Sequence, residues 1–180
     1  MNTPSPPPAA PAPTPLPQSG AQGGAPVLSD ESYYTALITL ADWGDAKAQH
    51  NLGALFLEGV EVQQDYAEAF KWHSLAAAQG MALAQHDLAT LYLEGLGVVE
   101  DPDLAAFWFE KAAQQGDSKA QNNLGILYAT GQGRPLDLVQ AYQWFSRAAA
   151  GGLWDALDNR EMAAQEMTAE QLTAARQLSA

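Results

Sequence analysis

The stretch AQHNLGALFLEGVEVQQDYAEAFKWHSLAAAQG, residues 48–80, is followed by two related stretches of equal length. These are AQHDLATLYLEGLGVVEDPDLAAFWFEKAAQQG at 84–116 and AQNNLGILYATGQGRPLDLVQAYQWFSRAAAGG at 120–152. They align without a gap at a spacing of 36 residues, and the positions that agree include Leu52, Leu88 and Leu124; Gly59, Gly95 and Gly131; Trp72, Trp108 and Trp144; and Gly80, Gly116 and Gly152. Self-similarity at such a period is typical of stacked repeats, which bury their apolar faces only against their neighbours.

Each repeat has the pattern of two helices. In the first half Ala48, Leu52 and Phe56 recur at helical spacing until Gly59, which stands where a C-terminal cap belongs. The second half begins at an Asp that can act as an N-cap and ends at the last Gly of the unit. The three expected N-caps are Asp65, Asp101 and Asp137.

The pattern predicts an all-α fold, a right-handed α-solenoid of helix-turn-helix repeats. Alanines in the second helices allow neighbouring helices to approach closely, and the three tryptophans are expected to fill the core. We predict a capping half-repeat at 29–44, in which Ser29 caps the helix and Tyr33 and Tyr34 cover the first repeat, then repeats at 45–80, 81–116 and 117–152. A C-terminal partial repeat with a capping helix follows at 153–180, opened by a capping box at Thr168 and Gln171.

Residues 1–28 have a different composition. Nine of the eleven prolines lie in residues 1–26, where Ala, Ser, Gly and Thr make up most of the rest. Such a segment buries too little apolar surface to offset the entropy of ordering, so we expect a disordered Pro/Ala-rich arm. Its PxxP matches have no flanking Lys or Arg, so they favour a tether over a ligand for another domain.

Charge and composition narrow the function classes. The net charge is -13, and no basic cluster is present, which disfavours nucleic acid and anionic membrane surfaces as partners. There is no cysteine, hence no disulfide or thiolate metal site, and no apolar span of 18 residues. Because no signal peptide is visible, a cytoplasmic location is expected for the chain as given; processing of its N-terminus leaves a periplasmic or secreted location open.

The second repeat carries a recognisable motif: Ala84, Leu88, Tyr92, Gly95, Gly97, Val98, Asp101, Ala105, Trp108, Ala112, Ala113 and Gly116. In this pattern the chain resembles the Sel-one-like repeat (SLR) family of tetratricopeptide-like proteins over residues 33–180. Glu61 replaces the second loop Gly in the first repeat, and Arg134 replaces Val in the third, which leaves the loop conformations of those repeats open.

The resemblance implies a non-catalytic scaffold or adaptor that binds a protein or peptide. In such arrays the first helices line a concave groove, and the residues before the core Leu face into it. Relatives linked to β-lactam chemistry are cysteine-rich, so that activity is not carried over to this chain. The candidate groove residues are His50, Asn51, His86, Asp87, Asn122 and Asn123.

Other chemistry has weaker support. His50 and His86 stand one repeat apart, and helices packed about 10 Å apart hold such a pair too far from each other for one metal. We expect Asp87 to face away from His86 and see no third ligand, so we predict no metal and no cofactor. No nucleophile or phosphate-loop motif occurs, and we predict no enzymatic activity.

We therefore expect a monomer that binds a protein or peptide in its groove. Two alternatives stay open: a structural or regulatory module that acts through its acidic outer surface, and an enzyme of unrecognised type.

Overall fold

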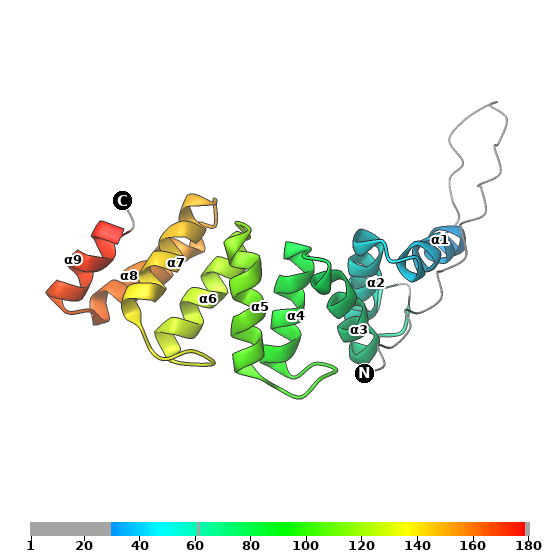
Figure 1. Ribbon diagram of the computed structural model, residues 1–180, viewed down its shortest axis with the longest axis horizontal. Coiled ribbons are helices and arrows are strands. Elements are labelled where there is room, and N and C mark those ends of the chain that lie inside the picture. Colours follow the sequence, from blue (N-terminus) through cyan, green and yellow to red (C-terminus); the bar gives the residue numbers. More distant parts are fainter. Residues whose placement is uncertain (1–29, 61, 179–180) are drawn as a thin grey trace, which may run out of the picture.

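The computed structural model describes residues 30–60 and 62–178. Within these ranges the chain forms nine helices and no strand: α1 (Asp30–Asp42), α2 (Ala46–Glu58), α3 (Tyr66–Ala78), α4 (Ala82–Glu94), α5 (Pro102–Gln114), α6 (Ser118–Thr130), α7 (Leu138–Ala150), α8 (Asp155–Glu166) and α9 (Ala169–Leu178). The pairs α2/α3, α4/α5 and α6/α7 stand in a row between α1 and α9 (Figure 1). This arrangement confirms the predicted α-solenoid.

The helix ends follow the repeated signals. Asp65, Asp101 and Asp137 each accept a backbone N–H of the first turn of α3, α5 and α7, which confirms the three predicted N-caps. The first helices end at glycines with left-handed backbone, Gly59, Gly95 and Gly131. Asp45 and Asp117 cap α2 and α6, which the sequence analysis did not foresee.

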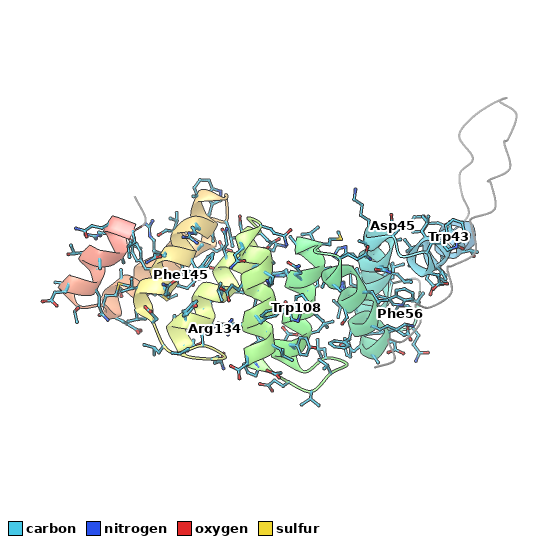
Figure 2. The ribbon with its side chains drawn as sticks, viewed as in Figure 1. Trp43, Asp45, Phe56, Trp108, Arg134 and Phe145 are labelled. Carbon is cyan, nitrogen blue, oxygen red and sulfur yellow. The ribbon has the colours of Figure 1, made fainter. Side chains whose placement is uncertain are left out.

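The core consists of small residues between large ones. Ala76, Ala105, Ala112 and Ala141 are fully buried, as the close approach of helices requires. Trp72 and Trp144 are buried, and half-buried Trp108, near the middle of the array (Figure 2), packs against two of the apolar clusters. The tryptophans therefore fill the core as predicted.

Buried glutamines connect each repeat to the one before it. Gln49, Gln85 and Gln121 each donate their side-chain amide to a carbonyl eight residues earlier, at 3.0, 3.2 and 3.1 Å. Their acceptors lie near the C-terminal end of the preceding helix, where backbone carbonyls have no partner inside that helix. The same polar bond therefore recurs at each junction.

Both ends carry a helix that differs from the repeats. Leu37 and Ala41 of α1 are buried with Leu52 of α2, and half-buried Tyr34 packs against them, while the side chain of Tyr33 is exposed. At the other end Thr168 and Gln171 bond reciprocally, backbone N–H to side chain, at 2.9 and 3.2 Å, which confirms the predicted capping box. Residues 1–28, Ser29 and Glu61 lie outside the described residues.

The loops after α4 and α6 have the same backbone form. Gly97 and Gly133 have φ of 71° and 61°, and each lies against the backbone at the start of the preceding second helix, Tyr66 and Pro102. Arg134, which replaces Val98, leaves the loop unchanged and forms a 3.0 Å ion pair with Glu110 of the preceding repeat. None of the described helices is long and apolar enough to cross a bilayer.

Replacing Gly97 by Ala tests the close approach between repeats. A Cβ at Gly97 would collide with the carbonyl of Tyr66, whereas at Gly116, also at positive φ, it would meet nothing within 4 Å. Gly116→Ala should therefore cost about 1 kcal/mol of backbone strain, and Gly97→Ala at least about 2 kcal/mol more. Urea unfolding followed by circular dichroism measures both, and equal losses would contradict the close approach.

Candidate functional site

Polar side chains on neighbouring first helices pair in the same way at each step of the array. His50 Nε2 of α2 lies 2.8 Å from Asp87 Oδ2 of α4, and His86 Nε2 of α4 lies 3.3 Å from Asn123 Nδ2 of α6. Asn159 of α8 donates to Asn122 Oδ1 of α6 at 2.9 Å. The partners in each pair are 37 residues apart. We call these three pairs the polar ladder.

Asp87 is the centre of the ladder's first step. Its Oδ2 bonds His50 and lies 3.8 Å from Nδ1 of His73, while its Oδ1 lies 3.1 Å from Nδ1 of His86. Burial alone would raise the pKa of the Asp87 carboxyl, but the hydrogen bonds from His50 and His86 outweigh it and hold that pKa well below its usual range. The hydrogen bond to Asp87 in turn raises the pKa of His50. Asp87 is therefore a carboxylate surrounded by three imidazoles.

His73 of α3 is the buried member of this group. It is 0% exposed, and neither of its ring nitrogens has a hydrogen-bond partner in the described structure. Its ring lies against that of His50, with centroids 5.3 Å apart, and occupies space that Gly53 leaves open, because a Cβ there would come within 2.9 Å of the ring. Burial lowers the pKa of His73 to about 4, so the ring is uncharged at neutral pH.

The structure brings together most of the predicted site residues, but in a way the sequence analysis did not expect. His50, His86, Asp87 and Asn123 form one connected group, and Asn122 belongs to the separate third pair. The expectation that Asp87 faces away from His86 was wrong: the two residues are neighbours on α4, and His86 Nδ1 lies 3.1 Å from Asp87 Oδ1. Asn51 is exposed; it lies in the first repeat, where no earlier first helix is described to supply a ladder partner.

Two residues of the site were missed. At the positions equivalent to His73 the other repeats have residues of another kind. Asn159 lies in the C-terminal partial repeat, outside the three regular units. Alignment at 36 residues places His73 with Phe109 and Phe145, so a polar residue in an apolar column was the available signal. His73 approaches Asp87 from the second helix, so the structure offers a third potential metal ligand that the sequence did not reveal: ligand atoms of His50, His73 and Asp87 lie within 4.8 Å of one another.

Two pockets lie further along the face formed by α4, α6 and α8, which we call the first-helix face. One, of about 370 Å³, lies between α6, α7 and α8 and is lined by Ile126, Ala129, Thr130, Leu138, Phe145, Asn159, Met162, Ala163 and Glu166. The other, of about 180 Å³, lies toward α4 and is lined by Thr90, Leu93, Glu94, Phe109, Asn123, Ile126, Leu127 and Gln132. Both contain a ladder asparagine, and they share Ile126.

Replacing His73 by Phe should stabilise the metal-free protein. Phe145 occupies the equivalent position beside Gly125, so the space beside Gly53 accepts the larger ring. Removing a buried, unpaired polar group should raise the free energy of unfolding by about 1 kcal/mol. Phe109→His, the reverse change in the second repeat, should lower the free energy of unfolding by about 1–3 kcal/mol. Thermal unfolding in the presence of a chelator measures both, and a lower Tm for His73→Phe would show that the His73 nitrogens are satisfied in solution.

Comparison with known proteins places the repeats in a family. The family model for the Sel1 repeat matches residues 46–81, 82–117 and 118–153, each one residue later than the expected repeat bounds. A search of curated proteins finds no match.

Solved structures agree. A protective antigen of uropathogenic Escherichia coli strains with an SLR fold is 37% identical, with a TM-score of 0.77; the match covers 84% of this chain and 32% of that one. This chain therefore spans about a third of that relative. A Sel1 repeat protein from Oxalobacter formigenes is 37% identical over 71% of this chain and 96% of its own, with a TM-score of 0.64.

The cysteine-rich protein B of Helicobacter pylori shares the fold at 24% identity and a TM-score of 0.56, over 69% of this chain and 95% of its own. Three matched repeats, the described helix pairs and these structural relatives lead to one conclusion: the chain belongs to the Sel1 repeat family.

Proposed function

We propose that this protein is a non-catalytic scaffold that binds an extended segment of another protein along its first-helix face. The observation that carries the proposal is the pair of adjoining pockets at α4, α6 and α8. The larger pocket is mainly apolar, and two of its residues, Ile126 and Met162, are 37% and 57% exposed. Exposed apolar side chains around a hollow favour an apolar anchor residue of a partner.

The polar ladder supplies suitable groups for a peptide backbone beside these pockets. A side-chain amide has two N–H donors and two lone pairs on its oxygen. The 2.9 Å bond between Asn122 and Asn159 uses one donor and one lone pair, so both residues retain hydrogen-bonding capacity. Asn159 lines the larger pocket and Asn123 the smaller one. An extended segment that passes both pockets would meet a polar amide at each.

Charge indicates what flanks the anchor. Glu166 lines the larger pocket and Glu94 the smaller one, in a chain of net charge -13. Opposite charges on two partners accelerate their association, whereas like charges that face each other across an interface weaken binding. We therefore propose a segment with a Leu, Ile or Met anchor next to Lys or Arg.

The hydroxyls in the pockets favour binding over catalysis. Thr90 and Thr130, the hydroxyl residues of the two linings, donate to helix carbonyls four residues earlier, at 3.1 and 2.9 Å. A nucleophilic hydroxyl needs a base that accepts its proton. These hydroxyls are instead held in bonds to their own helices, as is common for Thr within a helix.

Selection of peptides from a random display library tests the proposal. Selected peptides should share an apolar residue next to a basic one, and Ile126→Asp should weaken their binding at least about tenfold, because it places a charge in both pockets. Ile126 is preferable to His86 or Asn123 for this purpose, because substituting either of those also breaks a ladder pair. Fluorescence anisotropy with the selected peptides measures the affinity.

Leu75→Asp is the matched control. Leu75 is 44% exposed on α3, outside both pocket linings, so this change adds the same charge to the other layer of helices. It should leave affinity within about twofold, and circular dichroism should show that both variants are folded. If peptides bind Ile126→Asp as well as the parent, and salt alone releases them, the acidic outer surface is the binding site and the proposal fails.

A further inference from the structure

The three steps of the array offer an internal comparison. At each step a first-helix residue, a second-helix residue of the same repeat and a first-helix residue of the next repeat occupy equivalent positions 36 residues apart. The sets are His50, His73 and Asp87; His86, Phe109 and Asn123; and Asn122, Phe145 and Asn159. The fold accepts Asn and Phe at these positions, so solenoid packing alone does not call for the His-His-Asp set.

His73 is the member that packing explains least. Phe109 and Phe145 are buried at the equivalent positions, and both belong to apolar clusters. A phenyl ring suits such a place because it has no nitrogen that needs a hydrogen-bond partner. His73 is as deeply buried but brings two unpaired nitrogens. A buried polar atom without a partner among the protein's own groups costs free energy, and binding of an ion is one of the established reasons for such an atom.

We propose that His50, His73 and Asp87 bind one divalent transition-metal ion of the kind that two imidazoles and a carboxylate hold in proteins, represented here by zinc. His50 Nε2 and Asp87 Oδ2 are 2.8 Å apart, His73 Nδ1 is 3.8 Å from the same oxygen, and all three ligand atoms lie within 4.8 Å of one another. Ligands of a tetrahedral zinc stand about 3.3 Å apart. The distances among the three ligand atoms in this structure lie on both sides of that value.

The surroundings suit a bound cation. His86 Nδ1, 3.1 Å from Asp87 Oδ1, holds the second carboxylate oxygen, and Asn123 in turn holds His86. Such outer hydrogen bonds orient a ligating carboxylate. The side chains of His50 and Asp87 are 17% and 29% exposed, while that of His73 is fully enclosed. The ion would therefore have protein on one side and a fourth position open to water on the other.

The ion would join two repeats. His50 and His73 belong to the first repeat, and Asp87 belongs to the second, so the bound metal links α2 and α3 to α4. Metal bound only by the folded state adds to its stability. This inference does not depend on the proposed peptide binding, because the metal is measured with the protein alone and the pockets lie at later steps of the array.

Isothermal titration of the untagged full chain with zinc chloride tests the site. The buffer contains excess calcium, which occupies acidic surface groups but is a poor ion for imidazole. We expect one zinc per chain, reversed by a chelator, and a zinc-dependent rise in Tm. His73→Phe should reduce the affinity at least about a hundredfold and abolish the rise in Tm, because it removes a direct ligand while keeping a side chain that the other repeats use.

His86→Asn is the matched control. Like His73→Phe, it removes one of the three histidines of the chain, and it introduces the residue that the third repeat has at the equivalent position, Asn122. It should change zinc affinity by no more than about tenfold, which is the lower end of the range for a residue that only orients a metal ligand. Asp87→Asn should behave like His73→Phe. Absence of a saturable site in the parent, equal affinity in His73→Phe, or a loss in His86→Asn as large as in His73→Phe would each overturn the assignment.

Discussion

The close approach of each repeat to the one before it is the constraint on which the rest of the structure depends. Fully buried alanines such as Ala76 and Ala112 let helices meet almost backbone to backbone, and Gly97 and Gly133 bring loops against the start of α3 and α5. Larger side chains at these positions would push the repeats apart. Since the same residues recur at each junction, every repeat is placed on its neighbour in nearly the same way.

That regular placement explains the polar ladder. Once the repeats are related by one displacement, equivalent residues on first helices face each other at every step, and the pairs 37 residues apart follow. The contact is constant, but its chemistry is not: it is His with Asp, then His with Asn, then Asn with Asn. Packing thus sets where side chains meet, and substitution at those places is tolerated because the buried alanines and glutamines hold the repeats together independently.

The two features on which the proposals rest belong to different steps of the array. The His-His-Asp group belongs to the first step, whereas the pockets belong to the second and third steps. The larger pocket includes Met162 and Glu166 of α8, the helix that begins the C-terminal partial repeat. The C-terminal partial repeat therefore contributes to a surface as well as closing the core. The two features are nevertheless neighbours, because Asn123, which lines the smaller pocket, bonds to His86, and His86 bonds to Asp87.

The sequence by itself determined the solenoid, the three Asp N-caps, the terminal capping box and which side chains lie before the core Leu. These depend on spacing within one chain segment, where helical geometry relates position to direction. Only the tertiary structure decided that Asp87 contacts His50 and His86, that His73 reaches the same carboxylate, and that Ile126 and Met162 border one pocket. Apart from Asp87 and His86, which are neighbours on α4, those contacts join residues on different helices, and their distances depend on how closely the repeats pack, which the spacing within a repeat does not specify.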